Sequence, residues 1–328
     1  MKVLVTGADG MLGTCVCKEL LKREIEVVAL VQSLDKKTAL CSFPLQRIEG
    51  DILNIQSIRN AMQGVDYVIH IAASTSVWPR KNPRLFDVNV QGTKNVATIA
   101  KELGVKRFIH IGSASSFGNG SRENPANEQS SIKKSDSTLD YVWSKHAAQE
   151  WLLNQFKEAH FPVIIINPTF MIGPFDALPS SGKILLSYFN RQLPAFTSGG
   201  KNFVNTEDVA TAVVNALTMG KEGECYITGG ENLSFKEFLM KAATLSNRQF
   251  TMMYAPKPLI LLIGFTQSFI ARITGRAPQL SFSMAKSSLK RQYFSSEKAV
   301  RELNFPQYPI EFGISSCFLW FKENGKLK

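Results

Sequence analysis

Short apolar runs alternate with amphipathic stretches through the first half of the chain. The runs are rich in Val and Ile and nearly continuous, which is typical of strands buried on both faces of a parallel sheet. The expected strands are Val3–Val5, Val27–Val31, Leu45–Glu49, Tyr67–Ile71, Phe108–Ile111 and Val163–Ile166. The expected helices are Leu12–Lys22, Ile55–Met62, Leu85–Leu103 and Tyr141–Phe156. This alternation predicts an α/β fold with a doubly wound parallel sheet, which binds ligands at the carboxyl ends of its strands.

The alternation of strand and helix patterns is less regular in the second half of the chain. Loop signals such as Gly173-Pro174 and Ser198-Gly-Gly200 interrupt it there. A strand at Phe203–Val204 and a helix at Asp208–Leu217 are expected to return to the sheet. Further helices are expected at Ser234–Ser246 and Ser295–Leu303. The second half therefore forms a smaller, irregular region that packs over the binding edge of the sheet.

The amino-acid composition does not change this prediction of an α/β fold. The chain has 328 residues, of which 44% are hydrophobic and 20% charged, an ordinary balance for a globular protein. The 38 basic residues outnumber the 27 acidic ones and give a net charge of +11. Because the sequence contains no Lys/Arg block and no nucleic-acid-binding motif, we expect no nucleic-acid partner. Scattered, solvated surface charge explains most of the excess.

The cysteines and the N-terminal sequence indicate in which cellular compartment the protein is expected. Five cysteines, none of them in a CxxC pair, argue against a disulfide framework or a zinc site and fit a reducing environment. The sequence opens directly on a strand pattern and lacks the layout of a signal peptide. The longest apolar run, Pro258–Phe265, is too short to span a bilayer. We therefore expect a cytoplasmic protein without a transmembrane segment.

A glycine-rich turn connects the first expected strand to the first expected helix. Gly7 permits a tight turn, Gly10 lets the backbone approach a pyrophosphate, and Gly13 lets the helix pack closely on the strand. The free amides around Met11 and Leu12, together with the helix dipole, would hold the phosphates. The GxxGxxG spacing departs from the GxGxxG fingerprint, but its position between strand and helix predicts a dinucleotide site.

The end of the second strand bears on the choice between NAD and NADP. An acidic residue there would bind the ribose 2′-hydroxyl, but the strand runs into Gln32. Lys36 and Lys37 follow closely enough to meet a 2′-phosphate. The sequence therefore favours NADP(H) over NAD(H). The competing interpretations are lysines that are simply solvated and a ribose contact from Asp35.

Two further segments are expected to lie along the cofactor. Asp51 and Ile52 follow the third strand and would edge the adenine, and Asp51 is also a candidate cap for the next helix. Ala72, Ala73 and Ser74 end the fourth strand, where small side chains let a dinucleotide lie against the backbone. Plain packing is the alternative role for the two alanines.

Tyr141 and Lys145 are the main catalytic candidates. Residues four apart on a helix share one face, so the phenol and the ammonium group reach the same space. The ordinary tyrosine pKa of about 10 is too high for base chemistry at neutral pH, and a nearby ammonium lowers it. Lysine can also hydrogen-bond the nicotinamide ribose, so both residues are expected to contact the cofactor. A YxxxK pair is common by chance, but its place after the fifth strand makes this one informative.

A serine-rich turn leaves that fifth strand. Ser113 would lie at the carboxyl edge of the sheet, where it can hold a substrate oxygen against Tyr141. Ser115 and Ser116 are candidate substitutes, and a backbone cap is the alternative role for any serine in this turn.

Taken together, these residues resemble the extended short-chain dehydrogenase/reductase superfamily, also called the NAD-dependent epimerase/dehydratase superfamily. The resemblance covers nearly the whole chain. It rests on Thr6–Gly13, Gly50-Asp51, His70–Ala73, Val88–Asn95, Ser113, and Tyr141 with Lys145. It implies that Ser113, Tyr141 and Lys145 form the catalytic trio and that Asn89 is a supporting active-site asparagine.

The segment Asn167–Phe175 resembles the dihydroflavonol 4-reductase branch in particular. In that branch a Pro-Thr…Gly-Pro-Phe segment follows the sixth strand beside the nicotinamide, which implies that Pro168 and Thr169 contact the cofactor. The tail from Gln292 to Leu303 is also typical of bacterial relatives. The flavonoid enzymes have an arginine near the end of the second strand, whereas this chain has Gln32. That departure argues against the NADP preference, and no residue marks a flavonoid pocket.

The domain and function predictions follow from this resemblance. A Rossmann-type NAD(P)-binding domain is expected at residues 1–172, with 203–219 returning to it, and a substrate-binding region at residues 173–202 and 220–328. The favoured function is hydride transfer between nicotinamide and a small carbonyl or alcohol substrate. A nucleotide-sugar epimerase that retains NAD is one alternative, and a non-catalytic NAD(P)-binding sensor or scaffold is another. A 4,6-dehydratase is disfavoured, because the Asp-Glu pair typical of such enzymes does not follow Ser113.

Several features of the chain lie outside this scheme. The apolar residues around 250–270 are interpreted as a helix that packs against the cofactor domain, and contact with an apolar substrate is the alternative. Basic residues follow them at Arg272, Arg276, Lys286, Lys290 and Arg291. A solvated face is the favoured interpretation of these charges, and weak contact with an anionic membrane surface is the alternative. His70 and His110 are expected to be packed, satisfied core residues rather than metal ligands. The oligomeric state stays open, a homodimer included.

Overall fold

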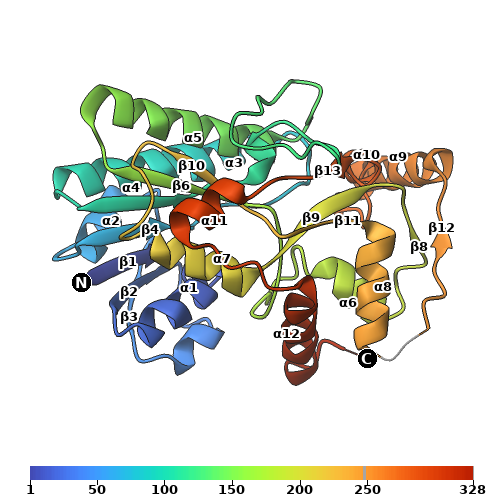
Figure 1. Ribbon diagram of the computed structural model, residues 1–328, viewed down its shortest axis with the longest axis horizontal. Helices are drawn as coiled ribbons and strands as arrows, with labels where there is room; N and C mark the ends of the chain where they lie inside the picture. Colours follow the sequence, from blue (N-terminus) through green and yellow to red (C-terminus); the bar gives the residue numbers. More distant parts are fainter. Residues whose placement is uncertain (247–248, 328) are drawn as a thin grey trace.

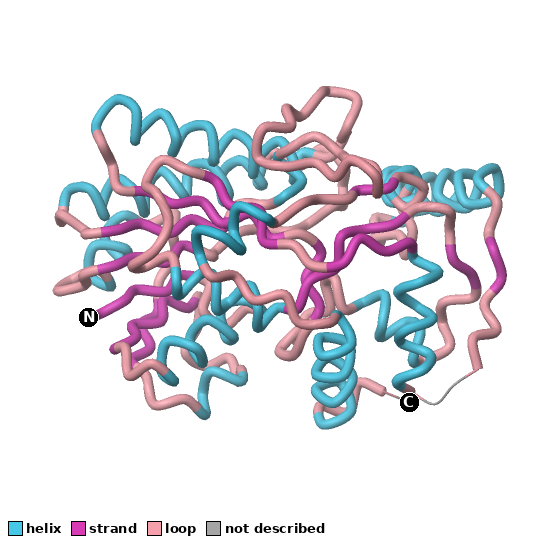
Figure 2. Tube along the Cα trace, viewed as in Figure 1, coloured by secondary structure: helices cyan, strands magenta, loops and turns pink. Residues whose placement is uncertain are grey.

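Seven parallel strands form the central sheet of the computed structural model, which describes residues 1–246 and 249–327. Their order is β10-β6-β5-β4-β1-β2-β3 (Figures 1 and 2). The strands are β1 (Lys2–Thr6), β2 (Glu26–Val31), β3 (Gln46–Glu49), β4 (Tyr67–His70), β5 (Arg107–Ile111), β6 (Val163–Pro168) and β10 (Cys225–Thr228). The predicted α/β fold with a doubly wound parallel sheet is confirmed.

Helices cover both faces of this sheet. One face packs against α1 (Met11–Lys22), α7 (Thr206–Asn215) and α11 (Glu297–Leu303). The other packs against α2 (Ile55–Ala61), α4 (Gly92–Glu102) and α5 (Asp140–Ala159). Strand β6 is buried along its whole length, because its alternate side chains belong to the two opposite cores. Burying each large apolar side chain of this kind contributes on the order of 1.5–3 kcal/mol.

The helix predicted at Leu85–Leu103 is divided into three parts. A short α3 (Arg84–Phe86) leads into a π-helical turn at Asp87–Gln91, and α4 follows. A π-turn adds one residue to a helical turn and occurs often at functional sites. The hydrophobic periodicity does not reveal this turn, because the apolar face of α4 resumes directly after it.

A second, smaller sheet lies in the C-terminal region. It contains β11 (Glu231–Ser234), β9 (Gly200–Asn205) and β13 (Arg291–Gln292), with β7 (Phe170–Ile172) paired to β9. Apolar side chains of this sheet pack against α6 (Lys183–Phe189), α8 (Phe235–Leu245) and α12 (Ile310–Glu323). The remaining elements are β8 (Ala195–Phe196), β12 (Met253–Tyr254), α9 (Lys257–Thr274) and α10 (Phe282–Ser287), with 3-10 turns at Ala39–Ser42 and Ala114–Ser116.

The returning segment differs from the prediction in two ways. The strand expected at Phe203–Val204 belongs to β9 and pairs with β7 and β11, not with the central sheet. Helix α7 does return and packs against α1. Strand β10, which the sequence analysis placed in the substrate-binding range, pairs with β6 and completes the central sheet. The physical reason is that the chain passes directly from β6 into β7 and leaves the edge of β6 free for the fully buried β10.

The apolar stretch around 250–270 also differs from its prediction. It forms α9, which packs against α10 and not against the central sheet. A Cβ at Gly264 would lie 2.7 Å from the Cβ of Ala285, so the two helices approach closely there. In Figure 1, α9 and α10 lie at the opposite end of the molecule from the N-terminus. The apolar side chains on the outer face of α9 are therefore exposed.

Candidate active site

The glycine-rich turn has the close contacts that its sequence predicts. Gly7 has a φ of +66°, and a Cβ there would lie 2.7 Å from the backbone nitrogen of Ala72. A Cβ at Gly13 would lie 2.2 Å from the carbonyl oxygen of Gly7, so α1 can pack this closely only with glycine. Gly10 caps α1, which begins with Met11 and Leu12, and no side chain of the described residues bonds to the cap. The first amides of α1 therefore fit a pyrophosphate.

Thr6 and His70 join the carboxyl ends of β1 and β4. The Thr6 hydroxyl accepts hydrogen bonds from the amides of Ile71 and Ala72, each at 3.2 Å, and lies 2.8 Å from His70 Nδ1. Burial lowers the pKa of His70 to about 3, so the ring is neutral at physiological pH. These bonds hold Ala72 against Gly7, which confirms His70 as a satisfied core residue. His110 is packed beside it, but among the described residues neither of its ring nitrogens has a partner.

The loop after β2 folds back toward the glycine-rich turn. Gln32 is exposed, and Lys36 Nζ lies 3.5 Å from Asp9 Oδ2 in that turn. Glu49 Oε2 accepts a hydrogen bond from the amide of Leu34 at 3.0 Å. A cation and two carboxylates therefore hold the loop that follows β2, and the sequence analysis did not single out Glu49.

Asp51 does not cap α2, so that part of the prediction is wrong. Its Oδ1 accepts the amide of Leu53 at 2.9 Å within a turn that comes before the helix. The cap is Asn54, whose side chain accepts the amides of Gln56 and Ser57. Ile52 is buried.

Ser113, Tyr141 and Lys145 converge at the carboxyl end of β5. Ser113 lies in the exit turn of that strand, where its hydroxyl forms hydrogen bonds with Tyr141 and, at 2.7 Å, with Ser115 Oγ. Lys145 lies one helical turn after Tyr141 on α5 and is only 4% exposed. Its Nζ donates to the carbonyl oxygen of Ile111 at 2.5 Å. Two hydroxyls and a buried amine thus share one space.

Burial dominates the electrostatics of this group. It lowers the pKa of Lys145 to about 8. It also raises the pKa of Tyr141 above its ordinary value, and the hydrogen bond with Ser113 opposes that rise. The sequence argument expected the ammonium to lower the tyrosine pKa, but burial raises that pKa instead. A phenol that stays protonated at neutral pH is suited to donating a proton.

Asn89 lies in the π-turn and connects the exit of β4 to α5. Its Oδ1 accepts the amide of Ser74 at 2.7 Å, and its Nδ2 donates to Ser144 Oγ at 2.9 Å. The Ser144 hydroxyl in turn donates to the carbonyl oxygen of Tyr141 at 2.8 Å. Asn89 therefore holds the helix that carries the tyrosine and the lysine. Ser144 was missed by the sequence analysis, because only a contact between elements reveals its role.

A second pair of polar residues, also missed, supports Ser113. Asn167 Nδ2 donates to the carbonyl oxygen of Ser113 at 3.2 Å and to Gln149 Oε1 at 2.8 Å. Pro168 is buried at the end of β6, and Thr169 Oγ1 donates to Asn202 Oδ1 at 2.8 Å. The Thr169 hydroxyl is therefore engaged with β9.

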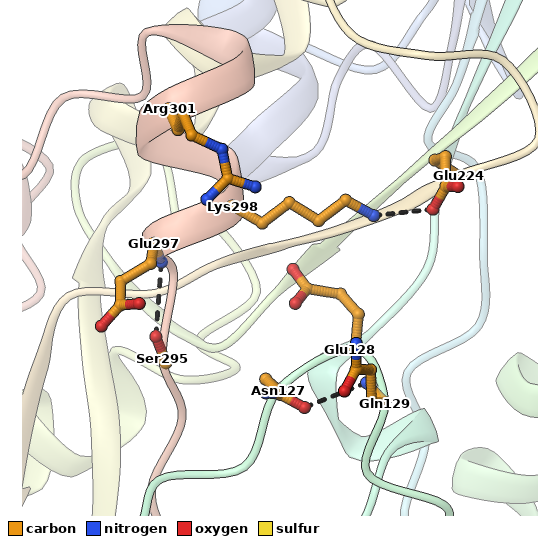
Figure 3. A pocket seen from close by; sticks show the side chains of 8 residues that line it. All are labelled: Asn127, Glu128, Gln129, Glu224, Ser295, Glu297, Lys298 and Arg301. Carbon is orange, nitrogen blue, oxygen red and sulfur yellow. Dashed lines mark hydrogen bonds and ion pairs between the residues drawn. The ribbon is translucent and has the colours of Figure 1, made fainter.

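A polar hollow of about 440 Å³ lies elsewhere, between the loop after Ala126, β10 and α11 (Figure 3). Lys298 Nζ is 2.7 Å from Glu224 Oε2 and also donates to the carbonyl oxygen of Cys225. Ser113, Tyr141 and Lys145 do not line it. Its ion pair closes the edge of the sheet beside β10, so the hollow is separate from these three residues.

Comparison with known proteins shows the family to which this chain belongs. The model of the NAD-dependent epimerase/dehydratase family matches residues 3–229. A provisionally named dihydroflavonol 4-reductase of Synechocystis sp. is 30% identical and covers 99% of this chain and 95% of its own length. Sterol demethylase protein B of Methylococcus capsulatus is 27% identical, with full coverage of both chains.

Solved structures show the same similarity in the fold. The crystal structure of gox2253 has a TM-score of 0.86 and 28% identity, with 99% of each chain covered. A nucleoside-diphosphate-sugar epimerase from Pseudomonas aeruginosa has a TM-score of 0.78 and 21% identity, covering 100% of this chain and 99% of its own. The match to the latter concerns the fold alone.

Proposed function

This chain belongs to the NAD-dependent epimerase/dehydratase family, within the extended short-chain dehydrogenase/reductase superfamily, and on that premise we propose that it reduces a carbonyl group or oxidises the matching alcohol. The observation that carries the proposal is the convergence of Ser113 and Tyr141 with the buried Lys145. A protein that only binds NAD(P) needs no proton donor of this kind. The reductase name given to the Synechocystis relative also supports this direction of chemistry.

Each member of the trio has a distinct role in the proposed reaction. When bound, the nicotinamide supplies the hydride that reaches the carbonyl carbon. Tyr141 donates its phenolic proton to the carbonyl oxygen, and Ser113 donates a hydrogen bond to the same oxygen. Lys145 stabilises the phenolate that remains, since its ammonium lies one helical turn away. Asn89 keeps this face of α5 in position through Ser144.

The cofactor is proposed to lie along the carboxyl edge of the sheet. Gly7, Gly10 and Gly13 would hold the pyrophosphate at the start of α1. The backbone of Ala72, Ala73 and Ser74 would border its nicotinamide half, with Pro168 and Thr169 on the other side, and Asp51 and Ile52 would border the adenine. The substrate is proposed to enter between this edge and the C-terminal region.

We propose a modest preference for NADPH. Gln32 places no charge at the ribose, and Lys36 reaches the phosphate-binding turn. The carboxylates of Asp9 and Glu49 partly offset that cation, so the preference is expected to be small rather than absolute.

Substitution of Tyr141 tests the mechanism. Tyr141→Phe removes only the hydroxyl, so we expect a folded protein that binds NADPH but turns over at least about 10³-fold more slowly. The exposed Tyr254, far along the chain on β12, gives a matched control: Tyr254→Phe should keep the full rate. Turnover would be followed at the nicotinamide absorbance with a panel of aldehydes, ketones and nucleotide sugars. Near-native rates in Tyr141→Phe would refute the mechanism, and conversion of a nucleotide sugar without net oxidation of NADPH would point to an epimerase.

A further inference from the structure

Helix α9 carries a continuous apolar stripe on its outer face. Leu262, Phe265, Phe269 and Ile273 follow one another at intervals of three or four residues, which places them on one side of the helix. Six large apolar side chains of α9 are between 47% and 72% exposed: Leu259, Leu262, Phe265, Phe269, Ile270 and Ile273. A contiguous exposed apolar patch marks an interaction surface more often than isolated residues do.

The stripe is exposed because the opposite face of α9 is firmly attached. Gly264 and Ala271 are buried there, and a Cβ at Gly264 would collide with Ala285 of α10. Gln267 Oε1 accepts the amide of Leu280, and Ser268 Oγ accepts the amide of Phe282, each at 2.8 Å. These bonds fix which side of the helix faces outward.

The segment of sequence that contains this stripe carries charge of one sign. Between Glu237 and Glu297 the sequence contains no Asp or Glu but has eight basic residues: Lys241, Arg248, Lys257, Arg272, Arg276, Lys286, Lys290 and Arg291. Lys257, Arg272 and Arg276 are exposed at the two ends of α9. Their side chains form no ion pair with any residue that the structure describes. The apolar stripe is therefore flanked by positive charge that nothing described in the chain neutralises.

We propose that α9 docks this protein on the surface of an anionic phospholipid bilayer. The stripe would enter the boundary between headgroups and acyl chains, while Lys257, Arg272 and Arg276 contact lipid phosphates. A surface position agrees with the length of the element, since no helix within residues 1–246 and 249–327 is long and apolar enough to cross a bilayer. A basic rim without acidic residues favours anionic lipid over a second copy of the same chain, which would bring like charges together.

Vesicle co-sedimentation tests this docking with the full chain. We expect binding to vesicles of phosphatidylcholine with about one third phosphatidylglycerol, and much weaker binding to phosphatidylcholine alone. Each removed surface cation should weaken binding about fivefold, so Arg272→Gln with Arg276→Gln should weaken it about 25-fold. Phe265→Ser with Phe269→Ser should weaken it at least about tenfold for each side chain.

Matched controls separate docking from general effects. Lys101→Gln with Lys157→Gln removes two exposed charges elsewhere, and Phe312→Ser alters a side chain that is 63% exposed on α12. Both controls should bind anionic vesicles like the wild type, and every variant should keep its melting temperature and its turnover in solution. Failure of the wild type to bind anionic vesicles would overturn the proposal, as would equal loss of binding in the controls. The proposal would also fail if the wild type formed a dimer and did not bind vesicles, and if Phe265→Ser with Phe269→Ser dissociated that dimer. In that case α9 would be an interface between two copies of the chain.

Discussion

Strand β6 and helix α9 are both rich in large aliphatic residues, yet they have opposite environments. Val163, Ile164, Ile165 and Ile166 are completely buried, whereas the outer side chains of α9 are mostly more than half exposed. The strand is covered because helices lie on both faces of its sheet, whereas within the described part of the chain α9 packs mainly against α10, on one side. Hydrophobicity thus predicts that a segment will be covered, but it does not say whether the cover comes from the same chain.

The largest expected effect lies in the buried region, at Lys145. Lys145→Met replaces a buried amine by an apolar chain of similar length, and we expect about a 10³-fold loss in kcat/KM for the carbonyl substrate. Lys157→Met makes the same exchange at the exposed end of α5 and should change the rate less than twofold. Steady-state kinetics would measure both. Equal rates for the two variants would remove the distinction between catalytic and surface lysines.

Stability should show the same contrast between β6 and α9. Ile165→Ala leaves a cavity in the core, so we expect the free energy of unfolding to fall by about 2–5 kcal/mol. Ile273 is 72% exposed, and Ile273→Ala should stay within about 0.5 kcal/mol of the wild type. Urea unfolding of both variants in solution compares them directly. A large loss in Ile273→Ala would mean that the outer face of α9 is already covered in the free protein.

An intermediate effect is expected at the rim of the nucleotide site, where a ligand would cover exposed side chains. Gln32→Asp adds a ribose acceptor and a charge that repels a 2′-phosphate. It should shift the ratio of NADPH to NADH affinity by roughly ten- to hundredfold toward NADH. Gln63→Asp places the same charge on a distant exposed residue and should leave the ratio unchanged. Titration of both cofactors tests this, and tighter binding of NADH by the wild type would contradict the NADPH preference.

The smallest effect concerns pH. Lys145 has a pKa lowered to about 8, so it is charged below that pH and neutral above it. A charged donor binds a ribose hydroxyl more strongly than a neutral one, and we expect affinity for NADPH to fall about fivefold as pH rises through about 8. Fluorescence titration across this range would show the change, and Lys145→Met should abolish it. An unchanged pH profile in that variant would assign the titration to another group.

The central sheet and the grouping of Ser113, Tyr141 and Lys145 were predictable because local patterns determine them. Continuous apolar strands, a glycine turn and a tyrosine four residues before a lysine are each visible in a short stretch of sequence. The supporting contacts were not visible in this way. Asn167, Gln149 and Ser144 acquire their roles only when β5, β6 and α5 lie side by side.

Strand order and surface exposure were also beyond local patterns. The sequence predicts that Phe203–Val204 is a strand, but pairing depends on which edge is free after the chain has left β6. The fate of α9 depends on how far the C-terminal region extends from the sheet, and nothing in the periodicity of 257–274 contains that information.

The late arrival of β10 has a consequence for how the protein is made. Its partner β6 ends at Pro168, and β10 is complete only about 60 residues later, at Thr228. At a synthesis rate of about 5–20 residues per second, the growing chain carries β6 with one edge unpaired for roughly 3–12 s. Such an edge readily pairs with other chains. A chain that ended at residue 172 would keep this edge permanently and is expected to aggregate, so the first half of the protein can be folded safely only with part of the second.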